Sequence, residues 1–181
     1  MAQNYEERVR AYDYDGLRRL WTGIQAGSAG AEWEPGKAFE HLILRAFQVE
    51  GAEVVWPYEV RQGADVVEQI DGVIYTNGLS CLIEAKDYSG NVDFQPVAKL
   101  RSQLLRRPAS AIGVVFSRSG FTEPAKIMTR YTMPQTVLLW EGTEIAYALE
   151  RQQMCQGLQI KFRYAVERGL PDYNLTNGGL S

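Results

Sequence analysis

The stretch Leu79-Ser80-Cys81-Leu82-Ile83-Glu84-Ala85-Lys86 decides the fold, because its apolar run up to Ile83 predicts a strand inside a sheet. Side chains alternate along a strand, so Glu84 and Lys86 share one face with Leu82. Two opposite charges therefore emerge on one face at the end of a buried strand, where charges are costly unless they are paired or used. An idle ion pair at a strand exit is one interpretation, and a functional site is the other.

Asp71 joins this strand end through a predicted hairpin. The run from residue 69 to 75 predicts a strand, and the following Thr76-Asn77-Gly78 is a hairpin signal. A short turn there brings Asp71 opposite Glu84 or Lys86, with the Cβ atoms of Asp71 and Glu84 about 5 Å apart. Two carboxylates this close repel unless a cation lies between them, and hard oxygen ligands favour Mg²⁺ or Mn²⁺. Asp71-Gly72 can alternatively be a turn or bulge.

Glu40 is the third candidate acid. Residues 36 to 49 predict a helix, on which Glu40 shares a side with Ile43 and Phe47. A carboxylate beside a buried stripe needs a partner, although a boundary glutamate that reaches solvent is the alternative interpretation. His41 is the only histidine, and it is turned about 100° away on the helix. We therefore expect His41 at the surface or boundary rather than at a metal.

The order of the predicted elements defines an α/β fold with a mixed central β-sheet flanked by helices. An antiparallel meander comes first, and strands joined through helices follow it. The predicted helices span about 5–24, 36–49, 93–106, a segment after a Thr122 cap, and 142–151. The predicted strands span about 54–60, 69–75, 79–86, 111–116 and 135–140, with an edge strand at 157–165 and a loose tail from 170.

Length and composition indicate one ordinary globular domain. The chain has 181 residues, of which 45 % are apolar and 23 % are charged. We divide it into an N-terminal helical extension at 1–30, the α/β domain at 31–150 and a C-terminal extension at 151–181. No stretch approaches the roughly 20 apolar residues that span a bilayer, and neither a secretory signal nor a cysteine-pairing pattern is visible. The sequence therefore predicts a cytoplasmic protein without a membrane partner.

The charge distribution bears on a nucleic-acid partner. The net charge of −3 counts mildly against one, but the stretch from Phe94 to Thr122 has five basic residues and no acidic residue. One basic face is enough for local phosphate contact, although a solvated helix face is the alternative. The candidate nucleic-acid-binding residues are a polar helical stripe and the turn after the next strand: Gln95, Lys99, Gln103, Arg106, Ser117 and Arg118.

Four pieces of the chain together resemble a known family. They are Gly36-Lys37-Ala38-Phe39-Glu40, Ile70-Asp71-Gly72, Ile83-Glu84-Ala85-Lys86 and the stretch from Ile112 to Thr122. Their order and their strand–helix context resemble the PD-(D/E)xK nuclease superfamily, and within it the Mrr-like restriction endonuclease domain. The resemblance covers about residues 36 to 140. Ile70 departs from the proline that is common before the aspartate in that superfamily.

The resemblance implies a restriction-endonuclease-like three-layer fold at 31–150 and a metal-dependent endonuclease that hydrolyses DNA, with a role in defence against foreign DNA. Asp71, Glu84 and the Ala85 carbonyl would bind Mg²⁺, with Mn²⁺ as a substitute. Lys86 would orient or help deprotonate the attacking water, and Glu40 would hold a metal-bound water or a second ion. Phosphodiester hydrolysis needs a nucleophile at neutral pH and positive charge beside the phosphate, which this set supplies.

Two alternatives to a DNA endonuclease stay open. One is a non-catalytic nucleic-acid or protein-binding module that retains the nuclease fold. The other is a junction resolvase or an RNase of the same fold. The partners are also open: a homodimer would place two sites to cut both strands, and a separate specificity or defence-system protein would supply sequence recognition.

Overall fold

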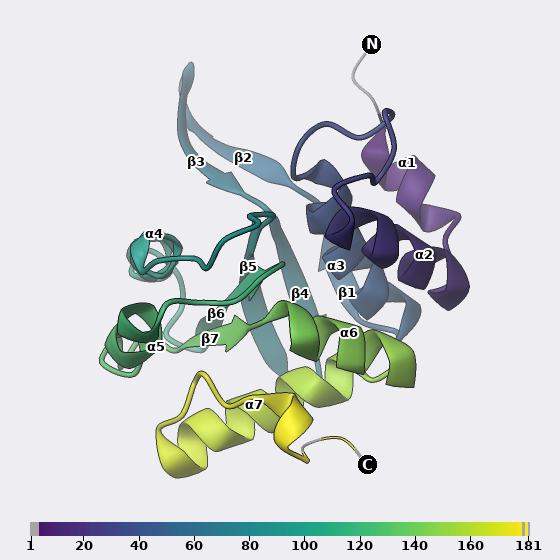
Figure 1. The fold of residues 1–181 in the computed structure, drawn as a ribbon. Helices are drawn as coiled ribbons and strands as arrows, with labels where there is room; N and C mark the ends of the chain where they lie inside the picture. Colours follow the sequence, from purple (N-terminus) through teal and green to yellow (C-terminus); the bar gives the residue numbers. More distant parts are fainter. Residues whose placement is uncertain (1–3, 179, 181) are drawn as a thin grey trace.

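A mixed β-sheet forms the centre of the molecule, which the computed structural model describes for residues 4–178 and 180. The strands in these residues are β1 (Glu53–Val55), β2 (Tyr58–Gln62), β3 (Asp65–Ile70), β4 (Gly72–Thr76), β5 (Leu79–Lys86), β6 (Ala111–Ser117) and β7 (Val137–Trp140). The central sheet has the order β1-β4-β5-β6-β7, and β2 and β3 form a separate hairpin (Figure 1). β1, β4 and β5 are antiparallel neighbours, whereas β5, β6 and β7 run parallel.

Helices cover both faces of this sheet. In the described part of the chain they are α1 (Tyr5–Arg10), α2 (Tyr14–Gln25), α3 (Lys37–Val49), α4 (Gln95–Leu104), α5 (Glu123–Thr129), α6 (Gly142–Arg151), α7 (Met154–Arg168) and the short 3-10 helix η1 (Leu175–Asn177). Figure 1 shows α4 and α5 on one side of the sheet and α3 and α6 on the other. The predicted α/β fold with three layers is confirmed. Among the described residues, no helix has both the length and the apolar character that crossing a membrane requires.

The alternation along β5 separates two hydrophobic clusters, one on each face of the sheet. Cys81 and Ile83 belong to the larger cluster, whereas Leu82 belongs to the smaller one with Leu100 of α4. The same alternation turns Glu84 to the side of the sheet that α4 covers. β5 is therefore buried on both faces from Cys81 to Ala85.

The β4–β5 hairpin has the predicted turn, in which Asn77 adopts a positive φ of 49°. Its register places Gly72 opposite Ile83. Gly72 is needed here because a Cβ atom would lie 2.6 Å from a side-chain carbon of Leu44 on α3. The absence of a side chain thus lets α3 approach the start of β4 closely.

Two of the predicted strands are interrupted. The strand predicted at 54–60 is divided between β1 and β2 around Pro57, which has no backbone N–H to donate to a ladder. The strand predicted at 69–75 is divided between β3 and β4 at Asp71. In both cases the second half leaves one sheet for the other, a change of direction that apolar periodicity does not reveal.

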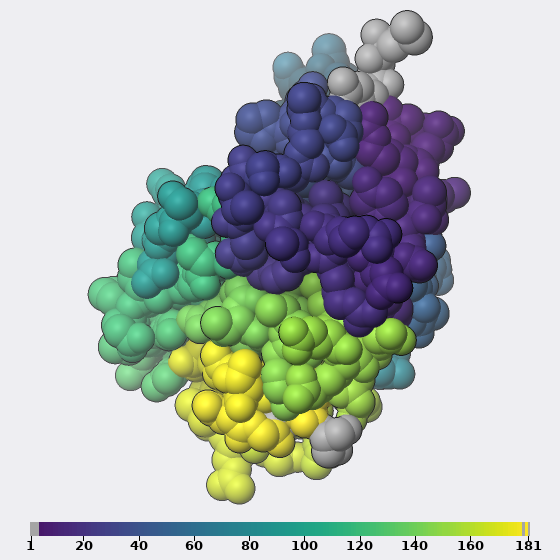
Figure 2. Space-filling model, turned by 45° about the vertical axis from the view of Figure 1, so that its right-hand side comes forward, coloured from purple at the N-terminus to yellow at the C-terminus, as the bar shows by residue number. Residues whose placement is uncertain are grey.

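The N-terminal segment is part of the same core as the sheet. The helix predicted at 5–24 is two helices, because the Asp13 carboxylate accepts a hydrogen bond from Gly16 N at 2.8 Å and starts α2 afresh. Val9 and Leu17 are fully buried in the larger hydrophobic cluster. Figure 2 shows this segment (purple) directly beside the green segment that contains α6.

The edge strand predicted at 157–165 is wrong, because these residues lie in α7. The buried positions of α7 recur at helical spacing: Met154, Leu158, Lys161 and Ala165. One of them is a lysine, which hid the apolar stripe. The loose tail predicted from 170 is also wrong for the described residues, since Leu175 is fully buried and Leu139 N donates to Pro171 O at 3.0 Å.

Lys161 gives the first test, because its ammonium is fully buried 2.5 Å from Glu144 Oε1. We predict that Lys161→Met lowers the free energy of unfolding by about 3–5 kcal/mol, since it leaves a buried carboxylate without its cation. Adding Glu144→Gln should recover part of this loss. Arg163→Met, at a position of the same helix that is 69 % exposed, should change the value by about 0.5 kcal/mol or less. Urea unfolding measures all three, and equal losses for the two single variants would contradict the prediction.

Candidate active site

Asp71 and Glu84 meet at one end of the β4–β5 hairpin. Gly72 lies opposite Ile83 at this end of the hairpin, so the next residue on each side is Asp71 or Glu84. Asp71 Oδ2 accepts a hydrogen bond from Ala85 N at 2.8 Å, and Glu84 is only 1 % exposed. The structure thus brings together the two acids that the hairpin argument paired.

Two ammonium groups hold the Glu84 carboxylate. Lys86 Nζ lies 2.5 Å from Oε1, and Lys99 Nζ donates to Oε2 at 2.7 Å. The Lys86 contact is a close ion pair with the buried Glu84 carboxylate. Burial lowers the pKa of Lys86, but the contact with Glu84 outweighs it and leaves the pKa raised. Lys86 therefore stays protonated at neutral pH.

The Asp71 carboxyl is electrostatically strained. Its pKa is raised from 3.8 to about 6, first by burial and then by the negative charge of Glu84. The hydrogen bond from Ala85 N and the charge of Lys99 act in the opposite direction, but they do not cancel the rise in pKa. A cation between the two acids would remove the repulsion between them.

Glu40 lies at the edge of this site, in the first turn of α3. Its Oε2 is 2.7 Å from Lys37 Nζ, and its charge adds to the raised pKa of Asp71. We expected His41 at the surface or boundary, but this prediction is wrong, because His41 is buried with only 5 % exposure. Its ring stacks on Trp56 with centroids 5.6 Å apart, and its Nδ1 lies 2.8 Å from the Lys37 carbonyl oxygen. His41 is thus a core residue at the base of α3.

The donors at the site fit a hard divalent cation. Asp71 and Glu84 offer carboxylate oxygens, and the Ala85 carbonyl is adjacent in the chain. Mg²⁺ commonly binds through one or two carboxylates and retains several waters, so this number of ligands suffices. Within residues 4–178 and 180, no three His, Cys, Asp or Glu side chains cluster so that they could hold a metal.

Gln95 and Lys99 are the candidate nucleic-acid-binding residues that lie at the acids. Together with Glu84 and Lys86 they line a surface depression of about 400 Å³. Gln95 is exposed at the first turn of α4 and bears directly on this depression. The helix that follows β5 therefore forms one wall of the candidate site.

Further along α4, the candidate residues hold the β2–β3 hairpin, which Figure 1 shows extending away from the central sheet. Gln103 is buried, and its Nε2 donates to Gln69 O at 3.3 Å. Arg106 pairs with Glu68, which also binds Arg107 at 2.5 Å. These contacts fasten the hairpin to the C-terminal end of α4 and to the two arginines that follow it.

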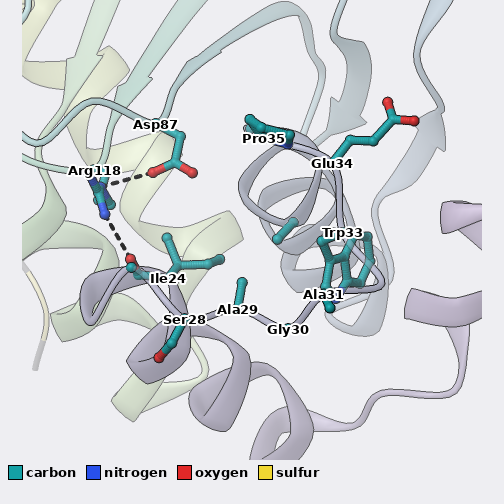
Figure 3. A pocket seen from close by; sticks show the side chains of 13 residues that line it. Ile24, Ser28, Ala29, Gly30, Ala31, Trp33, Glu34, Pro35, Asp87 and Arg118 are labelled. Atoms are coloured by element: carbon teal, nitrogen blue, oxygen red, sulfur yellow. Dashed lines mark hydrogen bonds and ion pairs between the residues drawn. The ribbon is translucent and has the colours of Figure 1, made fainter.

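Ser117 and Arg118 make contacts within the protein. Ser117 is fully buried and donates to Gly120 O at 2.9 Å. The Arg118 guanidinium lies 2.8 Å from Asp87 and donates to Ile24 O at 2.7 Å. Figure 3 shows these contacts at the edge of a pocket of about 530 Å³. Arg118 thereby ties the end of α2 to the loop that follows β5.

Sequence reasoning missed two sets of contacts. It assigned Lys99 to phosphate and did not foresee its ion pair with Glu84, because that contact depends on how α4 crosses β5. It also missed the pairing of Glu68 with Arg106 and Arg107. Two consecutive arginines at a helix end indicate an ion pair with some acidic residue, but the sequence does not indicate which acidic residue that is.

The mixed sheet flanked by helices, with two acids and a lysine at the end of its hairpin, is the arrangement that the sequence resemblance to restriction-endonuclease-like nuclease domains led us to expect. A family model of the Mrr type, described as restriction endonuclease, matches residues 32–149. The chain therefore belongs to this family, as the sequence resemblance predicted, and membership implies a DNA-cleaving hydrolase. No curated protein matches the chain.

Two solved structures are similar to this chain. One is a protein of unknown function, AF1548, with 18 % identity and a TM-score of 0.45, covering 72 % of this chain and 77 % of that one. The other is the MspJI restriction endonuclease in complex with a 27-mer oligonucleotide, also with 18 % identity and a TM-score of 0.45. That match covers 96 % of this chain and 39 % of MspJI, so the chain spans well under half of the MspJI length.

The raised pKa of Asp71 predicts how stability changes with pH. Above about pH 6 the folded protein without metal bears two mutually repelling carboxylates. As the pH falls below about 6, the folded protein takes up a proton at Asp71, and the penalty shrinks until it is lost near the ordinary pKa of 3.8. We predict that Asp71→Asn is more stable than the wild type at pH 8 in EDTA, by about 1–3 kcal/mol, and that this gain fades towards pH 4.

Thermal unfolding across this pH range measures the effect, with Asp65→Asn at an exposed position of β3 as the control. The control variant should follow the wild type at every pH. A gain in Asp71→Asn that does not change with pH, or a loss of stability at pH 8, would contradict the electrostatic explanation.

Proposed function

We propose that this protein is a Mg²⁺-dependent endonuclease that hydrolyses DNA phosphodiester bonds, with Mn²⁺ as a substitute ion. The observation that carries the proposal is the pair of acids formed by the half-buried Asp71 and the buried Glu84, with Lys86 2.5 Å from the second acid. Asp71, Glu84 and the Ala85 carbonyl would hold the ion. When bound, a divalent cation supplies positive charge beside the phosphate and lowers the pKa of a water.

The residues of the chain take distinct roles in this proposal. Lys86 is protonated at neutral pH because its pKa is raised, so it acts as a cation that donates hydrogen bonds to the phosphate or to the attacking water. Asp71 is fixed by Ala85 N, which keeps its second oxygen oriented. Glu40, paired with Lys37 at the edge, would bind a water in the outer sphere of the ion.

The substrate side of the proposal rests on α4. Gln95 and Lys99 line the same depression as Glu84 and Lys86, so a DNA backbone that reaches Glu84 through this depression passes along α4. Cleavage of foreign DNA in the cytoplasm is the role that we assign to this activity. A second copy of the chain would supply the site that cuts the second DNA strand, or a separate specificity protein would supply sequence recognition.

The direct test incubates the purified protein with plasmid and linear DNA in Mg²⁺, Mn²⁺ or EDTA. We predict nicking with either metal and none in EDTA. Lys86→Ala should lower the rate by about 10²–10³-fold, because it removes the charge beside the phosphate, and Asp71→Ala should lower it at least as much. Glu167→Gln, at a position of α7 that is 52 % exposed, is the control and should cut at the wild-type rate.

Three outcomes separate the proposal from its alternatives. DNA binding without cleavage under any metal would indicate a binding module that retains the nuclease fold. Faster cleavage of RNA or of branched DNA in competition would indicate an RNase or a junction resolvase. Asp71→Ala and Lys86→Ala proteins that cut as well as the wild type would place the chemistry elsewhere.

A further inference from the structure

Both oxygens of the Glu84 carboxylate already face an ammonium group. Lys86 Nζ lies 2.5 Å from one oxygen, and Lys99 Nζ lies 2.7 Å from the other. Glu84 itself is 1 % exposed, so these contacts are made inside the protein rather than in solvent. A metal ion that uses Glu84 must therefore share or displace one of two cations.

The two lysines are not equally held. Lys86 belongs to the same strand as Glu84, and its side chain is 22 % exposed. Lys99 reaches in from α4, and its side chain is 43 % exposed. Lys99 also lines two depressions, the one at the acids and another of about 490 Å³ between α4 and β3. Its long, half-exposed side chain borders both depressions, so its ammonium can be offered to a phosphate as well as to Glu84.

The charges at the site nearly balance without a metal. Asp71, Glu84, Glu40 and Asp93 are the acids, and Lys86, Lys99 and Lys37 are the cations near them. A divalent cation added to this set creates an excess of positive charge, which repels all three ammonium groups. A DNA phosphate brings the negative charge that restores the balance and gives a displaced ammonium a new partner.

We propose that Lys99 is a competitor for the metal, which occupies Glu84 in the free protein and moves to a DNA phosphate when the metal enters. The proposal rests on the metal-dependent function above and names a residue that regulates its site. Since the same ammonium serves Glu84 or the phosphate, metal and DNA bind with positive coupling, and each raises the affinity for the other by the same factor.

The experiment measures Mn²⁺ binding to the full chain without DNA, by electron paramagnetic resonance and by calorimetry. Lys99→Gln should bind Mn²⁺ about 10-fold more tightly than the wild type, because Glu84 loses its competing ammonium. Arg101→Gln is the matched control, since it removes one positive charge from an exposed position of the same helix. It should change the affinity by about 2-fold or less.

A second measurement tests the coupling with a short DNA duplex and Ca²⁺ as the probe ion. Ca²⁺ should strengthen DNA binding by the wild type more than DNA binding by Lys99→Gln, because the variant has no ammonium to transfer. Circular dichroism and thermal unfolding confirm that the variant is folded. Lys99→Ala repeats the comparison without a hydrogen-bonding side chain at this position.

The outcomes distinguish this inference from the proposed function. Lys99→Gln that binds Mn²⁺ no more tightly than Arg101→Gln would overturn the inference, whether or not the wild type cuts DNA. Equal coupling between Ca²⁺ and DNA in wild type and variant would overturn it as well. Tighter Mn²⁺ binding by Lys99→Gln supports the competition, and it does so even if the wild type proves unable to cleave, in which case the proposed function alone fails.

Discussion

The hydrogen bond from Ala85 N to the Asp71 carboxylate is the interaction on which the site depends. The β4–β5 ladder ends with Gly72 opposite Ile83, and beyond that pair a side chain rather than a strand satisfies the backbone N–H. The contact fixes Asp71 beside Glu84, which lies on β5, the middle strand of the sheet. It also requires Gly72, because Leu44 occupies the space where a side chain would lie.

Two acids held side by side repel each other, and lysines from two neighbouring elements offset part of this repulsion. The pKa of Asp71 is raised to about 6, because burial and the charge of Glu84 both oppose its ionisation. Glu84 remains compatible with its burial because β5 supplies one lysine and α4 supplies another. The arrangement holds two carboxylates side by side where a cation would relieve their repulsion.

Much of this was predictable, and the reasons are local. Alternation along 79–86 and the Asn77 turn were enough to bring Asp71 to Glu84, because both are features of neighbouring residues. Lys161 shows where such reasoning stops, since its burial depends on Glu144, which is distant in sequence, and no periodicity predicts a lysine in a core. The contact of Lys99 was hidden for a related reason, because helix crossing is a tertiary property.

The charge pattern of the chain also has a tertiary explanation. Most basic residues of the stretch between Phe94 and Thr122 form ion pairs with acids of the protein. The stretch is therefore not a free basic face, in keeping with the net charge of −3. Exposure then separates two kinds of pair. Arg118 is 15 % exposed and joins α2 to the loop after β5, so releasing it would disturb the fold. Lys99 and Arg106 are 43 % and 55 % exposed, so their cationic groups reach solvent, although the acids that they bind are buried. Glu84 has Lys86 as a second cation, so Lys99 can turn to a phosphate while its acid keeps a partner.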